Sequence, residues 1–296
     1  MSEITQNLPQ DTSRGPKRRQ SDLSVLAGRS VRTAILVIAT LWVLVPLFFM
    51  VIASFKSVAD FFINPFGLPD EWLWSNYTRA WDEANLRLTL PNTIIVTFCA
   101  VLGSSLLSAM VAYGLSRKEK KYALPLYTLF VSGLLVPVHA IILPLFIVLK
   151  AIGLFGTLLA LIVPYIAMGL PLGVLVLTPL AASLPKELMQ AARMDGASEW
   201  QVFRRIVLPL LKPGLLSVAI LNGVWMWNEF FIPLILAFKP EVQTMPVGIV
   251  SFIGSYSTEW GLVFASVLVS TLPVVVAYLL MTRQFQSGLT AGAVKG

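Results

Sequence analysis

Very few residues of this chain could carry out chemistry, and they lie far apart in the sequence. There is one cysteine, Cys99, and one histidine, His139, and both fall within apolar runs. A metal site or an activated nucleophile needs several such groups close together, so these two residues can form neither. The dipeptide Gly-Lys does not occur, which excludes a phosphate-binding P-loop. The sequence therefore predicts a protein that is not an enzyme and has no metal site or ATP site of its own.

One carboxylate, Glu229, lies within a long apolar run. A charged group is costly in lipid and usually faces a cavity or a partner. Asn222, Trp225 and Met226 precede it at helical spacing and would share its face of a helix. Indole, amide and carboxylate groups can bind a sugar by stacking and hydrogen bonds; the alternative is a structural contact with a partner subunit. His139 is open to the same two interpretations. The candidate residues of a solute path are His139, Asn222, Trp225, Asn228 and Glu229.

The composition of the chain is that of a membrane protein. Of its 296 residues, 56% are hydrophobic and 12% are charged, whereas a soluble domain carries about 25% charged residues. The mean hydropathy is +0.78. The net charge of +7 would suit nucleic acid. The basic residues gather between apolar segments, however, which indicates membrane topology and no nucleic-acid partner.

Six apolar segments are long enough to cross a bilayer, which takes roughly 20 helical residues. Residues 1–28 before them are polar, so we expect a disordered cytoplasmic tail there and a transmembrane domain over residues 29–296, with its core at about 90–284. Gly169 and Gly173 have the spacing that lets two helices approach closely. The predicted spans are 31–54, 91–116, 123–149, 156–180, 214–237 and 262–282.

The lysine and arginine residues predict the orientation of these spans. Six spans place both termini on one side, and positive residues favour the cytoplasmic side. Seventeen of the 22 basic residues lie in the two terminal regions and in the 117–121 and 183–213 loops. We therefore predict a multi-pass protein of the bacterial-type cytoplasmic membrane with both termini in the cytoplasm. The outward segments, 55–90 and 239–260, are too short for a folded domain, so substrate capture would need a separate receptor protein.

The 183–213 loop is the longest polar interruption in the second half of the chain. Pro185 suits the start of a helix, and Asp195-Gly196 would end it, because glycine adopts the left-handed conformation at little cost. Ser198 and Gln201 have the spacing of a capping box for a second helix, which Leu208-Pro209 would end. The apolar faces expected for the two helices are Leu188, Ala191 and Ala192, and Trp200, Phe203 and Val207. This helix–turn–helix is either a rigid element that docks a soluble partner or an amphipathic hairpin on the membrane surface.

The residues of this loop resemble the cytoplasmic coupling loop of ABC-importer permeases. That family has Glu-Ala-Ala, two residues, Asp-Gly-Ala, and later Phe, Ile, Leu-Pro and a further Pro. This chain has Gln190-Ala191-Ala192, Asp195-Gly196-Ala197, Phe203, Ile206, Leu208-Pro209 and Pro213. Gln190 departs from the usual glutamate, so an ion pair made there would lose its charge. The residues that the resemblance implies in coupling to an ATPase are Glu187, Gln190, Ala191, Ala192, Asp195, Gly196, Ala197, Phe203 and Pro209.

From about residue 30 to its end, the chain also resembles carbohydrate-type permeases of binding-protein-dependent importers, in particular the shorter permease of maltose-type systems. The matching residues are Ser54-Phe55-Lys56, Leu68-Pro69, Asn76-Tyr77, Ala112-Tyr113-Gly114 with Arg117, Trp227-Asn228-Glu229 and residues 288–296. The resemblance implies an all-α type I ABC importer permease fold with six transmembrane helices. It also implies a coupling loop at 183–213 and a C-terminal tail at 285–296 that reaches toward the ATPases.

The resemblance further implies the partners of the chain in the lipid membrane. They are a second permease subunit, two ATPase subunits that bind ATP with Mg²⁺, and an extracytoplasmic solute-binding protein that delivers a sugar or oligosaccharide. The chain itself would bind no cofactor and would form the translocation path with the second permease. The main alternative is a stand-alone secondary transporter or channel for a small polar solute. Such a protein has no need of a cytoplasmic helix–turn–helix and would show inverted repeats or several intramembrane charges.

Overall fold

The computed structural model describes residues 19–254 and 258–293. Apart from one isolated β-bridge between Ile253 and Thr258, every regular element in these ranges is a helix. The chain forms two compact units, residues 1–50 and residues 51–296. The all-α fold class is confirmed.

The first unit contains most of α1 (Arg19–Ala53). Its side chains from Val31 to Phe48 are exposed around the whole helix, and residues Val31–Ala53 have the length and hydropathy of a membrane span. An apolar helix without a polar face suits a lipid environment. The helix begins at Arg19, so residues 19–28, predicted to belong to the disordered tail, are helical. Residues 1–18 of the predicted disordered tail lie outside the described residues.

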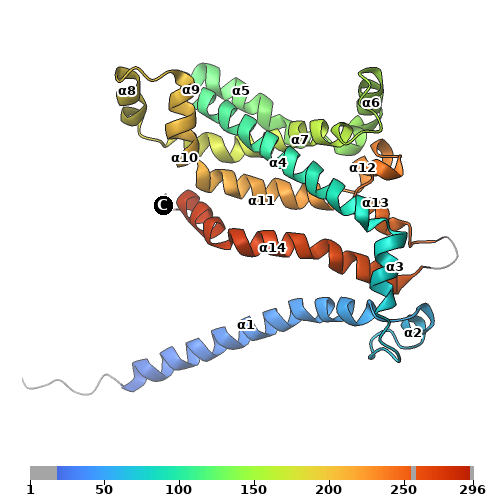
Figure 1. Cartoon of the computed structure of the whole chain (residues 1–296). Coiled ribbons are helices and arrows are strands. Elements are labelled where there is room, and N and C mark those ends of the chain that lie inside the picture. The colour runs from blue at the N-terminus through green and yellow to red at the C-terminus, as the bar shows by residue number, and fades with distance from the viewer. Residues whose placement is uncertain (1–18, 255–257, 294–296) are drawn as a thin grey trace, which may run out of the picture. The chain divides into compact units, whose positions relative to one another are not determined.

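Four long helices organise the second unit: α4 (Leu86–Ser116), α7 (Leu159–Ala182), α11 (Lys212–Asn228) and α14 (Trp260–Ala293). Helix α11 packs against the other three (Figure 1). One end of these helices carries α8, α9 and α10, and we call it the α8 end; the described end of α14 also lies there (Figure 1). The opposite end, which we call the α3 end, carries α3, α6, α12 and α13 (Figure 1). The remaining bounds are α2 (Val58–Ile63), α3 (Ser75–Glu83), α5 (Lys120–Ser132), η1 (Gly133–Leu135), α6 (Val138–Ala151), α8 (Lys186–Met194), α9 (Glu199–Val202), η2 (Phe203–Val207), α10 (Leu208–Leu210), α12 (Phe231–Leu236), η3 (Pro240–Val242) and α13 (Met245–Val250).

The described residues include four helices long and apolar enough to cross a membrane, or up to six spans if each of two bent helix pairs counts as one. The predicted span over 123–149 is a pair of helices with a sharp bend between them. The parts Lys120–Leu135 and Val138–Ala151 meet at 99°, because Val136 precedes Pro137 and adopts an extended conformation with ψ 115°. A proline disfavours the helical conformation in the residue before it.

The predicted span over 214–237 is also broken, and the expectation that Glu229 shares a helix with Asn222, Trp225 and Met226 is wrong. Helix α11 ends at Asn228, Glu229 is extended with φ −67° and ψ 125°, and α12 begins at Phe231. Pro233 explains the break, because its ring in a continuous helix would clash with the carbonyl group four residues earlier, that of Glu229. Glu229 therefore lies at a junction between two helices rather than within a helix.

Small residues bring α4 and α7 close together, as the spacing of Gly169 and Gly173 predicts. A Cβ atom at Gly173 would lie 2.1 Å from Ser108 Oγ, and one at Gly169 would lie 2.9 Å from Ser104 Cβ. Side chains at either glycine would separate the helices. Glycine and serine commonly allow such close packing between membrane helices.

Candidate functional site

Residues 183–213, here called the coupling element, fold as a helix–turn–helix. Helix α8 is followed by Gly196, whose φ is +83°. No atom lies within 4 Å of the place that a Cβ on Gly196 would take, so the backbone conformation alone favours glycine there. Ser198 and Gln201 then form the capping box of α9: each side chain accepts a hydrogen bond from the backbone N–H of the other, at 3.3 and 2.7 Å. The predictions for the turn and the second helix start are confirmed.

The sequence predicts that the second helix ends at Leu208-Pro209. The helix in fact continues beyond Pro209. It passes through a π-helical turn, η2, and continues as α10 to Leu210. In the π turn the Leu208 N–H bonds to the Phe203 carbonyl. This wider turn directly before Pro209 accommodates a proline that would disrupt a regular α-helix. The chain then bends by 73° into α11.

The inward faces of the coupling element differ in part from those expected. On α8 the buried side chain is Met189, whereas Leu188 is 48% exposed and Ala191 is also exposed. Phe203 and Val207 are buried as expected, but Trp200 is 57% exposed. The reason is that the ends of α4 and α7 determine which side is covered: the core cluster there joins Met189, Val202, Phe203 and Val207 to Tyr113 and Ala181. The apolar side chains of Leu188, Ala191, Met194 and Trp200 remain exposed on this element.

Glu199 attaches the coupling element to the end of α4. Its Oε1 accepts hydrogen bonds from Arg117 Nη2 at 3.2 Å and from Arg193 Nε at 2.9 Å. Its Oε2 accepts from the Tyr113 hydroxyl at 3.1 Å and from Arg117 Nη1. Arg117 also lies over the Tyr113 ring, 5.1 Å from its centre. We call these four residues the Glu199 network.

The Glu199 network joins the end of α4 to α8 and α9, and Glu199 follows Arg117 by 82 residues. The hydrogen bonds from Arg117 and then Arg193 hold the pKa of Glu199 below its usual value, so this side chain is ionised at neutral pH. Sequence reasoning missed Glu199 and Arg193, although it selected Tyr113 and Arg117 by resemblance. An acidic residue in the first turn of α9 is common for electrostatic reasons alone, so it gave no signal of a tertiary role.

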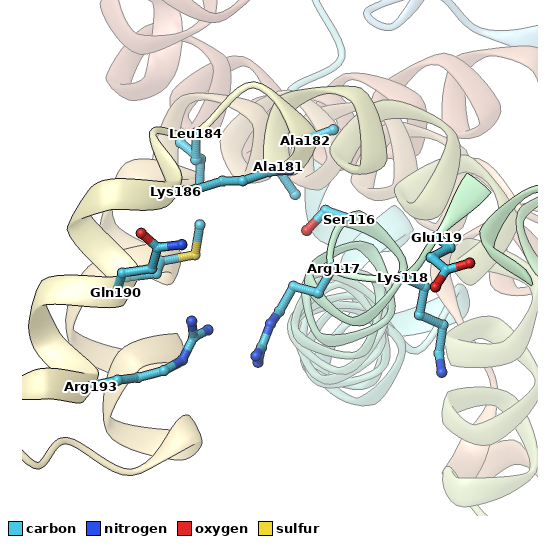
Figure 2. A pocket seen from close by; sticks show the side chains of 11 residues that line it. Ser116, Arg117, Lys118, Glu119, Ala181, Ala182, Leu184, Lys186, Gln190 and Arg193 are labelled. Carbon is cyan, nitrogen blue, oxygen red and sulfur yellow. The ribbon is translucent and has the colours of Figure 1, made fainter.

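A cavity of about 380 Å³ lies beside the coupling element, and Gln190 is among the residues that line it (Figure 2). Gln190, Arg193 and Arg117 point into the gap between α8 and the end of α4 (Figure 2). A glutamate at position 190 would therefore add negative charge next to the Glu199 network.

The candidate residues of the solute path are not brought together as one site. Asn222 is 3% exposed, and its amide donates to the Gly169 carbonyl at 3.1 Å and lies 3.4 Å from Ser104 Oγ. It thus links α11 to α7 and α4. Trp225 packs on Tyr165 with ring centres 5.6 Å apart. These contacts are within the helix bundle.

The other three candidates lie near the junction between α11 and α12. Glu229 Oε1 accepts hydrogen bonds from the backbone N–H groups of Phe231 and Ile232, at 2.9 and 3.1 Å, and so caps α12. His139, on α6, is exposed and stacks on Phe231 with ring centres 4.4 Å apart. Asn228 is exposed and donates to the Val224 carbonyl of its own helix at 2.8 Å. In the part of the chain that the structure describes, no group of three or more His, Cys, Asp or Glu residues could hold a metal ion.

Comparison with known proteins gives the family of the chain. Residues 104–287, which include the coupling element and the Glu199 network, match the family model of the binding-protein-dependent transport system inner membrane component. This chain belongs to that family. It is therefore a multi-pass permease subunit of an ABC importer that works with a binding protein, and ATP hydrolysis belongs to a separate subunit.

Several relatives match over most of their length. The diacetylchitobiose uptake system permease protein NgcG of Streptomyces coelicolor is 33% identical over 268 residues, 90% of this chain and 89% of the relative. A probable starch degradation products transport system permease protein, AmyC of Thermoanaerobacterium thermosulfurigenes, is 32% identical over 88% of this chain and 94% of the relative. The melibiose/raffinose/stachyose import permease protein MelC of Bacillus subtilis is 31% identical over 85% of this chain and 91% of the relative.

A solved structure supports the fold. A chain of a bacterial ABC transporter involved in the import of the acidic polysaccharide alginate aligns with a TM-score of 0.73 and 22% identity, over 92% of this chain and 100% of that chain. The ABC importer permease fold predicted from the sequence is confirmed.

Proposed function

We propose that this chain, paired with a second permease subunit, forms the path by which a sugar or oligosaccharide crosses the membrane. An external solute-binding protein delivers the solute, and two ATPase subunits that bind ATP with Mg²⁺ drive its import. The similar proteins whose names state a solute take up sugars such as diacetylchitobiose, melibiose and raffinose. The pairing as the shorter, maltose-type partner rests on the sequence resemblance.

The observation that carries this proposal is the construction of the coupling element. It is a helix–turn–helix tied to α4 through Glu199, with a turn that requires a positive φ at Gly196. It also leaves the apolar side chains of Leu188, Ala191 and Trp200 exposed. We assign these side chains, with Glu187, Gln190 and Asp195 on the same element, to contact with an ATPase subunit. Ala192, Ala197 and Phe203 pack on the inner side of the element, and Pro209, which is exposed, follows its π turn.

We further propose that the α8 end faces the cytoplasm. Basic residues support this orientation, since the 117–121 loop and the coupling element both lie at that end. A cysteine at the exposed position Asn64, at the α3 end, should then react with an impermeant thiol reagent in intact cells. A cysteine at Lys295 should be protected until the cells are opened. The native Cys99 is first replaced by alanine, and labelling of Lys295→Cys from outside would contradict the orientation.

For the solute path we propose His139, Trp225, Asn228 and Glu229, which lie on or next to α6 and the junction of α11 with α12. Asn222 has a different role in this proposal. Its amide already bonds to groups of α4 and α7, so it holds the three helices together and leaves no free donor for a solute.

The test of the proposed function is Gly196→Val. A β-branched residue at φ +83° is strained by roughly 1–2 kcal/mol, which is too little to unfold the bundle but enough to change the angle between α8 and α9. We expect the complex to assemble, with stimulation of its ATPase by solute-loaded binding protein reduced severalfold. The measurement uses the whole complex, purified and reconstituted in lipid.

Gly153→Val is the matched control. Gly153 has φ +73° and, like Gly196, no atom within 4 Å of the place that a Cβ would take, but it lies between α6 and α7 at the α3 end. Both variants carry the same type of backbone strain, so a loss of stimulation confined to Gly196→Val identifies the coupling element. Normal stimulation and normal uptake in Gly196→Val would remove the main support for the assignment.

A further inference from the structure

The cavity beside the coupling element has an unusual set of charges (Figure 2). Its volume of about 380 Å³ falls at the lower end of the range of roughly 300–1,000 Å³ that is typical of small-molecule sites. Four cationic side chains and one carboxylate line it. They are Arg117, Lys118, Lys186, Arg193 and Glu119.

The acidic residues nearby do not balance these cations. Glu119 is paired with Lys121, outside the lining, at 3.0 Å. Glu199 is shared by two guanidinium groups, so one negative charge faces two positive charges. Lys118 and Lys186 form no ion pair with any residue that the structure describes. An excess of positive charge therefore remains around the cavity.

The neutral residue at position 190 completes the arrangement. Gln190 points into the same gap as Arg117 and Arg193 (Figure 2). A glutamate there would cancel part of the positive charge and repel an anion, whereas the amide offers an additional hydrogen-bond donor. Guanidinium groups bind tetrahedral oxyanions through two parallel hydrogen bonds, which makes them well suited to phosphate.

We propose that this cavity binds a phosphate group, carried by an anionic phospholipid or free in solution. The cavity lies where two membrane-spanning helices end, α4 at Ser116 and α7 at Ala182. It is therefore at the level of lipid headgroups, whichever side of the membrane it faces. Basic pockets between transmembrane helices at this level bind anionic headgroups. The bound phosphate would neutralise the excess charge and hold α8 to the end of α4.

The test uses the double variant Lys118→Gln with Lys186→Gln. It lowers the charge of the cavity and leaves the Glu199 network intact. The control is Lys120→Gln with Lys212→Gln, which removes two exposed lysines of the same end that do not line the cavity. Both double variants have the same net charge, so general attraction to an anionic membrane decreases equally in the two proteins.

Two arms distinguish the sources of the phosphate. In the first, the protein is extracted from vesicles of phosphatidylethanolamine and phosphatidylglycerol, and the retained lipids are quantified by mass spectrometry. Enrichment of phosphatidylglycerol should fall roughly fivefold for each cavity lysine removed. In the second, thermal unfolding is followed in a zwitterionic detergent as inorganic phosphate replaces chloride at constant ionic strength.

Loss of phosphatidylglycerol enrichment in the cavity variant alone supports a lipid ligand. If inorganic phosphate stabilises the wild type and the control variant but not the cavity variant, and no protein enriches phosphatidylglycerol, the ligand is free phosphate. Equal behaviour of the two double variants in both arms overturns the proposal. An effect of the cavity lysines seen only when ATPase subunits are bound would identify an acidic protein surface as the ligand and would also overturn it. Neither arm measures uptake, so this proposal and the proposed function can fail separately.

Discussion

At the two ends of the second unit, different interactions hold the segments that connect the long helices. At the α8 end, charged side chains bond to one another across the protein surface: the side chains of Arg117 and Glu199 are 36% and 54% exposed. At the α3 end, buried polar side chains bond to the backbone. Asn76 donates to the carbonyl groups of Ser54 and Lys56 at 2.9 and 3.0 Å, and Asn92 donates to those of Glu241 and Gln243 at the same two distances.

The difference has mechanical consequences. A buried amide that satisfies two carbonyl groups is costly to remove, so the segments at the α3 end are held in one arrangement. An exposed ion network is weak and screened by salt, so its parts can shift and form again at little cost. The polar attachment of the coupling element to α4 is thus adjustable, while the buried side chains of Met189, Phe203 and Val207 hold its inner face. This suits the proposed role of the coupling element, which is to move with an ATPase subunit, whereas the α3 end provides a stable frame.

The largest effect on stability is expected from Asn76→Leu at the α3 end. Asn76 is 4% exposed, and leucine has a similar size but leaves the carbonyl groups of Ser54 and Lys56 without this donor. We expect the free energy of unfolding to fall by about 2–4 kcal/mol. Denaturant unfolding of the purified protein in detergent measures this change.

Asn228→Leu is the control for this prediction. Asn228 is exposed, and its amide bonds only within its own helix, to the Val224 carbonyl. Its replacement should change the free energy of unfolding by about 0.5 kcal/mol or less. If both variants lost the same stability, burial of the side-chain-to-backbone bonds would not explain how the α3 end is held.

The second prediction concerns Glu199→Gln at the α8 end. Glutamine keeps the size of the side chain but removes the charge that holds Arg117 and Arg193 together. Because the network is exposed, the loss of stability should be about 1 kcal/mol or less. The coupling element should nevertheless lose its polar attachment to α4, so uptake should fall severalfold while the complex still assembles. The ratio of solute transported to ATP hydrolysed, measured in proteoliposomes, gives the size of the effect.

Glu83→Gln breaks a comparable exposed ion pair at the α3 end, with Arg79 at 2.9 Å, and should leave this ratio unchanged.

The pH dependence provides a second check. Since the pKa of Glu199 is lowered in the folded protein, the network stabilises the coupling element at neutral pH and is lost as the pH falls through that lowered value. Acidification at the α8 end should lower the ratio of solute transported to ATP hydrolysed in the wild type. It should have no further effect on this ratio in Glu199→Gln. A wild-type ratio that equals that of the variant at neutral pH would contradict the role of Glu199.

The sequence predicted the parts of the fold that local rules determine. The positive φ of Gly196 and the capping box of Ser198 with Gln201 depend only on neighbouring residues, and both are present as predicted. The breaks at Pro137 and Glu229 also have local causes. The break at Glu229 was missed because hydropathy reports whether a segment is apolar and contains no information about its direction.

The contacts between distant segments could not be predicted in this way. Whether Met189 or Leu188 faces the core depends on how α8 packs against the ends of α4 and α7. The role of Glu199 depends on Arg117, which precedes it by 82 residues. Asn222 and Glu229 fit a solute path by residue type, but part of their bonding capacity is used by Gly169, Phe231 and Ile232.

A small effect on stability is also expected from Glu229→Gln, and this variant asks whether the solute path at the α3 end needs a charge. The amide oxygen of glutamine can still accept hydrogen bonds from the N–H groups of Phe231 and Ile232, so the cap of α12 is kept. The free energy of unfolding should change by about 1 kcal/mol or less. Glu229→Ala removes the acceptor as well and should cost about 1–2 kcal/mol, as the loss of a helix cap does. If the carboxylate contacts the solute, Glu229→Gln lowers uptake severalfold with assembly and basal ATPase activity unchanged. Uptake at the wild-type rate in Glu229→Gln, with a loss only in Glu229→Ala, would show that Glu229 acts as a cap and would remove it from the path.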